Sequence, residues 1–154
     1  MRILVLSDSH GAVYRMRQAV ELTEPQQILF LGDCLPDADK LQREFPHIPL
    51  TTVPGNCDWG SADEPERLIE LRGKRILMMH GHTRSVKYTL MNATYAAKEY
   101  GADILLFGHT HEPYLNQEKE MLVCNPGSLA RGDYAVMMQE GADCQITLKS
   151  LFDK

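Results

Sequence analysis

The sequence predicts one α/β domain with two mixed β-sheets, and two patterns lead to this prediction. The first two thirds of the chain alternate short apolar runs with stretches of helical spacing, which is typical of strands separated by helices. The last third contains only short runs separated by turn-forming residues, which is typical of hairpins. Since 154 residues are enough for one well-buried core, residues 1–154 are expected to form a single domain.

The strand predictions follow from apolar runs that end in turn-forming or polar residues. Five runs are expected to be the buried central strands: residues 3–6, 27–31, 48–53, 74–79 and 104–107. Five more are expected to form hairpins and outer strands: residues 67–71, 114–116, 121–124, 134–138 and 145–151, with a charged tip at 118–120. No internal repeat, linker or low-complexity segment divides the chain.

Three stretches have the apolar spacing of amphipathic helices. The first follows the opening strand and is expected to end before Pro25, and the second is expected to end before Pro46. The third is expected to span residues 85–100, because Gly101 is well placed to cap its carboxyl end.

Composition and charge narrow the class of protein. Apolar residues make up 44% of the chain and charged residues 24%, which is ordinary for a globular protein, and the net charge is −5. An acidic chain argues against general binding to nucleic acids or anionic membranes. No run approaches the length of a membrane span, and the amino terminus lacks the pattern of a signal peptide. The four scattered cysteines, Cys34, Cys57, Cys124 and Cys144, are therefore expected to be reduced thiols in the cytoplasm.

Polar residues of metal-binding type follow each of the five central strands. Asp8 and His10 follow the first, Asp33 the second, Asn56 the third, His80 and His82 the fourth, and His109 and His111 the fifth. Sites in open α/β sheets form beyond the carboxyl ends of the strands, so these side chains are expected to share one site. If the backbone is extended there, residues two apart point to the same side, and each such pair can face one cavity.

These residue types favour a metal centre. Aspartate, histidine and asparagine without a thiolate suit manganese, iron, nickel or zinc better than a structural zinc or a calcium site. Seven candidates are too many for one four-coordinate ion and suit two ions that share a ligand. They are Asp8, His10, Asp33, Asn56, His80, His109 and His111. A carboxylate with two oxygens, such as that of Asp33, is the natural bridge.

Taken together, these motifs resemble the calcineurin-like metallophosphoesterase superfamily, in particular its small YfcE-type branch of bacterial and archaeal phosphodiesterases. The motifs in question are Asp8-Ser9-His10, Gly32-Asp33, Gly55-Asn56-Cys57-Asp58, His80-Gly81-His82, Gly108-His109-Thr110-His111 and Asn125-Pro126-Gly127-Ser128. The resemblance implies a four-layer αββα sandwich and a dinuclear centre, most often of Mn²⁺, with Ni²⁺, Fe²⁺ or Zn²⁺ as alternatives.

The resemblance also implies a role for each matching residue. One ion would be held by Asp8, His10, Asp33 and His111, and the other by Asp33, Asn56, His80 and His109. The implied reaction is hydrolysis of a phosphoester, most of all a phosphodiester, by a metal-activated hydroxide. Asn56 and His80 would stand at the catalytic centre, and the Asn56 amide could also donate to a phosphate oxygen.

One position departs from the wider superfamily. A histidine that commonly follows the asparagine, and that is assigned to transition-state stabilisation or leaving-group protonation, is Cys57 here. Because a thiol is a poor acid near neutral pH, we expect a preference for esters with good leaving groups. His82 or Asp58 could replace it as the acid, or could simply form hydrogen bonds that orient the ligands.

Two other functions remain open at this stage. The same site could hydrolyse phosphomonoesters or nucleotides, and no specificity domain separates these from a phosphodiester substrate. A Vps29-like interaction scaffold is the alternative from another class, and it would show eroded ligands or a large exposed apolar patch. The expected partner is a small phosphoester, without membrane or general nucleic-acid binding, and self-assembly into a homo-oligomer stays open.

Overall fold

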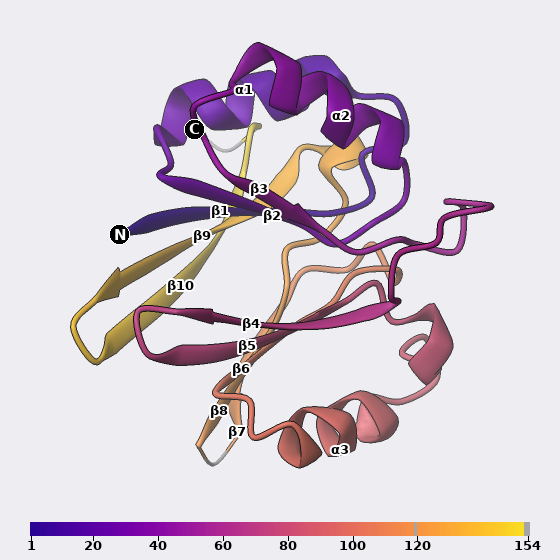
Figure 1. The fold of residues 1–154 in the computed structure, drawn as a ribbon, viewed down its shortest axis with the longest axis vertical. Coiled ribbons are helices and arrows are strands. Elements are labelled where there is room, and N and C mark those ends of the chain that lie inside the picture. Colours follow the sequence, from indigo (N-terminus) through magenta and orange to yellow (C-terminus); the bar gives the residue numbers. More distant parts are fainter. Residues whose placement is uncertain (119, 153–154) are drawn as a thin grey trace.

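The computed structural model describes residues 1–118 and 120–152, and it shows two β-sheets packed face to face (Figure 1). Helices α1 (Val13–Thr23) and α2 (Leu35–Glu44) cover the outer face of one sheet, and α3 (Met91–Glu99) covers the other. This arrangement confirms the predicted αββα sandwich. Of the expected domain 1–154, residue 119 at the predicted hairpin tip and residues 153–154 lie outside the described residues.

The first sheet has the order β10-β9-β1-β2-β3. Its strands are β1 (Arg2–Leu6), β2 (Gln27–Phe30), β3 (Leu50–Thr52), β9 (Asp133–Glu140) and β10 (Asp143–Ser150). Strands β1, β2 and β3, with β3 at the edge of the sheet, run parallel, because helices α1 and α2 provide the crossovers between them. Strands β9 and β10 form an antiparallel hairpin that pairs with β1.

The second sheet has the order β4-β5-β6-β8-β7. Its strands are β4 (Glu66–Leu71), β5 (Lys74–Met79), β6 (Ile104–Leu106), β7 (Tyr114–Glu118) and β8 (Met121–Asn125). Strands β5, β6 and β8 are parallel, and β4–β5 and β7–β8 are the two predicted hairpins. Short 3₁₀ helices η1 (His82–Arg84) and η2 (Leu129–Arg131) follow β5 and β8.

The central strands are apolar throughout because both of their faces are buried. In β1, Ile3 and Val5 face the second sheet, whereas Leu4 and Leu6 face α1 and α2. Burying side chains of this size contributes about 1.5–3 kcal/mol each. No helix among the described residues is long and apolar enough to cross a membrane.

The predicted helix over residues 85–100 is wrong in its first half. Ser85 has a left-handed backbone (φ 55°), which a continuous α-helix does not allow. The Thr89 hydroxyl accepts a hydrogen bond from the Met91 N–H at the start of α3, so the helix begins only there. Its end is as predicted: Gly101 is left-handed, and the N–H of Ala102 bonds back to the Ala97 carbonyl.

Two other boundaries moved for reasons that involve proline. The strand expected over 48–53 is shortened to β3, because Pro49 has no N–H to donate to a neighbouring strand. The second helix starts before the apolar spacing indicates, since Pro36 is well suited to a first helical turn. Its end before Pro46 is confirmed, as is the end of α1 before Pro25.

Candidate metal centre

The predicted site residues lie at the carboxyl ends of five strands, three from the first sheet and two from the second. Main-chain hydrogen bonds tie these ends together: the Asp8 N–H donates to the Gly32 carbonyl at 3.0 Å, and the Gly108 N–H donates to the His80 carbonyl at 3.0 Å. Each of these bonds joins loops of one sheet, and the two sheets are linked by His80 Nδ1, which lies 2.8 Å from the Leu31 carbonyl. The loops of both sheets therefore meet in one place, as the position of the polar residues predicted.

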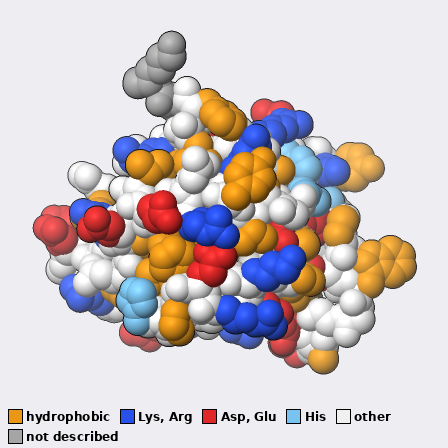
Figure 2. Space-filling model, turned by 90° about the horizontal axis from the view of Figure 1, so that it is seen from above, with side chains coloured by type: hydrophobic (Ala, Val, Ile, Leu, Met, Phe, Trp, Pro, Cys, Tyr) orange, Lys and Arg blue, Asp and Glu red, His pale blue; other side chains and the backbone are white. Residues whose placement is uncertain are grey.

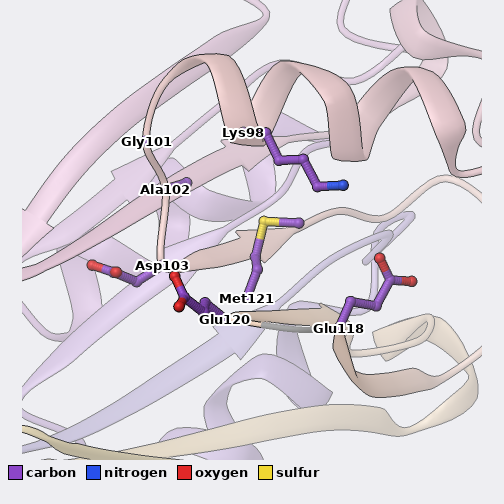
Figure 3. A pocket seen from close by; sticks show the side chains of 7 residues that line it. All are labelled: Lys98, Gly101, Ala102, Asp103, Glu118, Glu120 and Met121. Atoms are coloured by element: carbon purple, nitrogen blue, oxygen red, sulfur yellow. The ribbon is translucent and has the colours of Figure 1, made fainter.

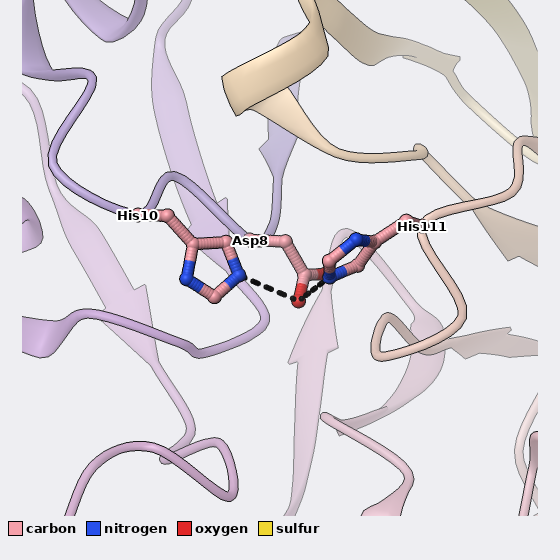
Figure 4. A group of neighbouring side chains, drawn as sticks. All are labelled: Asp8, His10 and His111. Carbon is pink, nitrogen blue, oxygen red and sulfur yellow. Dashed lines mark ion pairs between the residues drawn. The ribbon is translucent and has the colours of Figure 1, made fainter.

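Two groups of side chains in this place could each hold a cation, and they share Asp8. In the first group, Asp8 Oδ1 lies 3.7 Å from His10 Nε2 and 3.2 Å from His111 Nε2 (Figure 4). His10 and His111 approach the carboxylate from opposite sides, from loops of different sheets. Both histidines are partly exposed, whereas Asp8 is fully buried.

The second group consists of Asp8, Asp33 and His80 and is buried. His80 Nε2 lies 3.4 Å from Asp33 Oδ2 and 3.7 Å from Asp8 Oδ1. It also lies 3.0 Å from the Asn56 side-chain oxygen, so Asn56 joins this group. Asp33 Oδ2 is also 3.7 Å from His10 Nε2, which places this oxygen between the two groups.

His109 is near the second group but belongs to neither cluster of three ligand atoms. Its ring centre is 5.0 Å from that of His80, and its main-chain N–H donates to Asp8 Oδ2 at 3.2 Å. The structure thus brings together six of the seven predicted ligands in contacting groups and places the seventh beside them.

The expectation of extended backbone at the paired ligands is wrong. Asp8 and His10 have φ angles of 54° and 42°, and His109 and His111 have 71° and 64°. These values lie in the left-handed region, which residues other than glycine adopt only when surrounding contacts hold their backbone there. These tight loop conformations, and not strand alternation, place Asp8 beside His10, and they direct His111 to the first group and His109 toward His80.

Unpaired atoms show that these residues fit a cation. Asp8 Oδ1 is buried and accepts no hydrogen bond from any described residue. The Nδ1 of His80 lies 2.8 Å from the Leu31 carbonyl, so this nitrogen carries the ring proton. Nε2 then faces only the oxygens of Asn56, Asp33 and Asp8, and a proton or a metal ion is needed between them.

Charge interactions keep this group ready for a cation. Burial would raise the pKa of Asp33, but hydrogen bonds from His80 and the Cys57 N–H and the charge of His80 lower it below its usual range. Burial would lower the pKa of His80, yet Asp33 and Asp8 raise it above its ordinary value. The two carboxylates thus favour a positive charge at the position of His80 Nε2.

His109 has the opposite tendency. Burial, the charge of His80 and the charge of Lys87 lower the pKa of His109 to about 4. Its ring is therefore neutral near pH 7, which is the form that binds metal ions.

Asp58 is not placed as a proton donor, which corrects one of the sequence-based alternatives. Its two oxygens accept four main-chain hydrogen bonds at 2.7–3.1 Å, from the N–H groups of Asp33, Cys34, Leu35 and Gly55. These bonds occupy its acceptor positions. Asp58 instead holds the loops that carry Asp33 and Asn56.

His82 and Cys57 differ from Asp58 in accepting no main-chain hydrogen bonds within the part of the chain that the structure describes, and the Cys57 sulfur lies 3.7 Å from the Asn56 side-chain nitrogen, which donates to it. The His82 ring is 5.6 Å from that of His80 and 6.2 Å from that of His109, and its buried Nδ1 has no hydrogen-bond partner among the described residues. Burial and the charge of His80 lower the pKa of His82. Burial and the charge of Asp33 raise the pKa of Cys57, so its thiol keeps its proton near neutral pH.

Sequence reasoning missed several buried side chains that hold the ligands. The Ser7 hydroxyl donates to Asp8 Oδ2 at 2.6 Å, and the Ser128 hydroxyl donates to the Asp8 carbonyl at 2.9 Å. Asn125 donates to the Gly108 carbonyl and the Thr110 hydroxyl. For Asn125 and Ser128, the Asn-Pro-Gly-Ser motif was the available signal, whereas Ser7 and Asp37 carried none.

Close packing at a glycine fixes one of these loops. A Cβ atom at Gly108 would lie 2.1 Å from the Ser7 hydroxyl oxygen and 2.9 Å from Asp8 Oδ2. Only glycine therefore allows the loop after β6 to approach β1 closely enough to place His109 and His111 beside Asp8.

A separate cavity of about 420 Å³ lies at the other end of the second sheet (Figure 3). Its lining includes Lys98, Asp103, Glu118, Glu120 and Met121, at the amino ends of β6 and β8 and the end of α3. None of the predicted ligands lines it, so it is distinct from the candidate metal centre.

In the surface view, histidine side chains reach the exterior beside arginine or lysine side chains at one edge of the molecule (Figure 2).

The fold and the site define a protein that can hold divalent cations between carboxylates and histidines at the ends of two facing sheets. Residues 1–140 match the calcineurin-like phosphoesterase superfamily domain, and the chain belongs to this superfamily. The motifs in the sequence had indicated the same family.

Individual relatives agree with this assignment. The probable metallophosphoesterase YsnB of Bacillus subtilis is 34% identical over 132 residues, which cover 84% of this chain and 75% of that protein. The phosphodiesterase YfcE of Escherichia coli is 27% identical over 155 residues, with 84% and 80% covered.

Solved structures show the same fold. A predicted phosphoesterase from Streptococcus pneumoniae has a TM-score of 0.81 at 25% identity, covering 97% of this chain and 88% of that one. Vps29 of Entamoeba histolytica, solved in complex with Zn²⁺, also has a TM-score of 0.81, at 20% identity, covering 99% and 94%. At that identity Vps29 shares the fold and supports no further comparison.

Proposed function

We propose that this protein is a metal-dependent phosphodiesterase that uses two divalent ions, most readily Mn²⁺. The observation that carries the proposal is the group of buried oxygens around His80 Nε2, next to the second group around His10 and His111. Buried oxygens without hydrogen-bond donors are unfavourable, and a cation bound between them removes this cost.

Both Asp8 Oδ1 and Asp33 Oδ2 lie within 3.7 Å of histidines from both groups, and the distances are compatible with Asp33 as the shared ligand. We assign Asp8, His10 and His111 to the first ion and Asn56, His80 and His109 to the second, with Asp33 shared. Asp33 Oδ2 is within 3.7 Å of His10 Nε2 and within 3.4 Å of His80 Nε2. Its other oxygen accepts the Cys57 N–H at 2.9 Å, so the shared contact falls to Oδ2 alone.

The chemistry then follows from charge and position. When bound, two divalent ions supply Lewis acidity and lower the pKa of water, as phosphoester hydrolysis requires. Asp8 and Asp33 offset two of their four positive charges, which leaves a net positive site for an anionic phosphate. Asn56 is exposed, and we propose that its amide nitrogen, which lies 3.7 Å from the Cys57 sulfur, donates to a phosphate oxygen.

Weak proton donation limits the substrates that we propose. The Cys57 thiol is a poor acid and Asp58 is occupied by main-chain bonds, which leaves His82 as the candidate donor. Since its pKa is lowered, His82 is mostly neutral near pH 7. We therefore propose small phosphodiesters with good leaving groups as substrates.

The four free cysteines support a reducing compartment such as the cytoplasm.

The test is to restore activity to chelator-stripped protein with single metals. Bis(para-nitrophenyl) phosphate and para-nitrophenyl phosphate would be assayed side by side with Mn²⁺, Ni²⁺, Zn²⁺ and Mg²⁺. The proposal predicts turnover that needs metal and favours the diester. Preference for the monoester would indicate a phosphatase, and metal binding without turnover on either ester would favour a scaffold.

A further inference from the structure

Asp37 is a buried carboxylate near the site that is not among the proposed ligands. It lies in the first turn of α2, and only 3% of its surface is exposed. Its Oδ2 accepts a hydrogen bond from the Ser9 hydroxyl at 2.7 Å and another from the Gly11 N–H at 2.7 Å. Ser9 and Gly11 are the two neighbours of His10, so one oxygen holds the chain on both sides of this histidine.

The backbone at His10 needs such support. His10 has a φ angle of 42° and Gly11 has 90°, and the left-handed region is unfavourable for histidine. A residue keeps this conformation only when surrounding contacts fix it. The two bonds to Asp37 are contacts of this kind, because they fix the positions immediately before and after His10.

The surroundings of the Asp37 carboxylate favour a hydrogen-bond acceptor at this position. An aspartate in the first turn of a helix interacts favourably with the helix dipole, and both donors stabilise the charged carboxylate. After burial, the carboxylate of Asp37 is the next cause of the raised pKa of Cys34, which shows that the thiol lies beside it.

We propose that Asp37 is a positioning residue for His10, and thereby for the ion that His10 would hold, while the ion at His80 does not depend on it. The inference rests on the proposed function for its metal part. His80 is held differently, by its ring bond to the Leu31 carbonyl, and has no contact with Asp37 among those found.

Three variants test the proposal. Asp37→Ala removes the oxygen that accepts both hydrogen bonds, and Asp37→Asn keeps a side-chain oxygen that can still accept from Ser9 and Gly11. Asp39→Ala is the matched control, because Asp39 lies on the same helix but is exposed. Mn²⁺ would be titrated by calorimetry into each full-length, metal-stripped protein.

The proposal predicts that Asp37→Ala weakens one of two Mn²⁺ binding events by at least about tenfold and leaves the other within about threefold. Asp37→Asn should recover much of the loss, and Asp39→Ala should match the wild type. Unchanged binding of both ions in Asp37→Ala would overturn the proposal, and so would an equal loss of both.

A second measurement separates this proposal from the proposed function. Amide hydrogen exchange at Gly11 in the metal-free protein should be at least about tenfold faster in Asp37→Ala, because the N–H loses its acceptor. Unchanged exchange would overturn the positioning role whatever the metal data show. If the wild type takes up no ion but Gly11 exchange responds, the proposed metal function fails, and only the role of Asp37 in holding the loop survives.

Discussion

The loops that end the first-sheet strands and those that end the second-sheet strands meet at one site but are held by different chemistry. Carboxylates hold the first-sheet loops: Asp37 accepts hydrogen bonds from the Ser9 hydroxyl and the Gly11 N–H, and Asp58 accepts four main-chain hydrogen bonds. An amide holds the second-sheet loop: Asn125 donates to Gly108 and Thr110 and accepts from Gly127.

The difference follows from what each loop presents. The loops after β1 and β2 lead into α1 and α2, and chain entering a helix exposes N–H groups that need acceptors. The loop after β6 does not begin a helix, and it presents a carbonyl and a hydroxyl, which need donors. An aspartate in such a site can therefore hold a loop through hydrogen bonds or serve as a metal ligand, and its hydrogen-bond partners distinguish the two roles.

The largest expected effect is the loss of Mn²⁺ binding when Asp33, the proposed shared ligand of the first-sheet loops, is replaced. Asp33→Ala should reduce Mn²⁺ binding and diester hydrolysis by more than about 100-fold, because it removes the oxygen that we assign to both ions. Circular dichroism of the metal-free variant should remain that of a folded protein. Asp39→Ala is the control, and near-wild-type rates in Asp33→Ala would refute the shared ligand.

The next prediction compares how much Asn125 and Asp58, which hold the loops through hydrogen bonds, contribute to the free energy of unfolding. Asn125→Ala should lower the free energy of unfolding of the metal-free protein by about 3 kcal/mol, since its partners are buried and lose their hydrogen bonds. Asp58→Ala should lower it by about 2 kcal/mol, because water reaches the half-buried donors.

Denaturant unfolding measures both values, and Asp63→Ala in the exposed part of the same loop is the control for Asp58. A cost for Asp58→Ala no greater than that for Asp63→Ala would show that its four hydrogen bonds do not stabilise the fold.

A third prediction concerns the pH dependence of metal binding, to which His80 of the second sheet and Asp33 of the first contribute differently. His80 has a raised pKa, so below that pKa a metal ion must displace its proton, and Mn²⁺ affinity should fall by about tenfold per pH unit. Asp33 has a pKa below its usual range, so it stays ionised and adds no dependence in the same interval. In the metal-free protein the sign is reversed: protonated His80 stabilises the fold at low pH, and this contribution is lost as pH rises through its folded pKa.

Calorimetry in buffers of different ionisation enthalpy counts the protons released on binding. Release of close to one proton below the His80 pKa is the expected result, and affinity that does not change with pH would contradict it.

The smallest expected effect concerns leaving-group protonation. Cys57→His places a stronger acid at the exposed mouth of the site and should raise turnover of a diester with a poor leaving group by about fivefold. The rate on bis(para-nitrophenyl) phosphate should change little, because its leaving group needs no acid. Equal changes on both substrates would mean that the substitution acts through the loop and not through proton transfer.

Much of the fold was predictable because strand ends and polar residues coincide in the sequence. Apolar runs with both faces buried located β1, β2, β5 and β6, and the residues after them located the site. The start of α3 was not predictable, because residues 86–90 keep the apolar spacing of a helix although they form turns and irregular structure.

Within the site, residue type predicted which side chains gather but not how each is used. Asp58 and Asp33 are both aspartates in loops at strand ends, and only their partners show that one clamps the main chain while the other faces His10 and His80. Ser7 and Asp37 were missed because a buried hydroxyl or carboxylate that holds a loop leaves no spacing pattern in the sequence.

The most direct test of the central claim is a count of metal ions. Metal-stripped protein would be dialysed to equilibrium against Mn²⁺ near neutral pH, and the bound metal per chain would be determined by elemental analysis. Two sheets that deliver two ligand groups to one site predict two ions per chain, with one ion retained in His10→Ala. Uptake of no ion, or of a single ion by the wild type, would contradict the account.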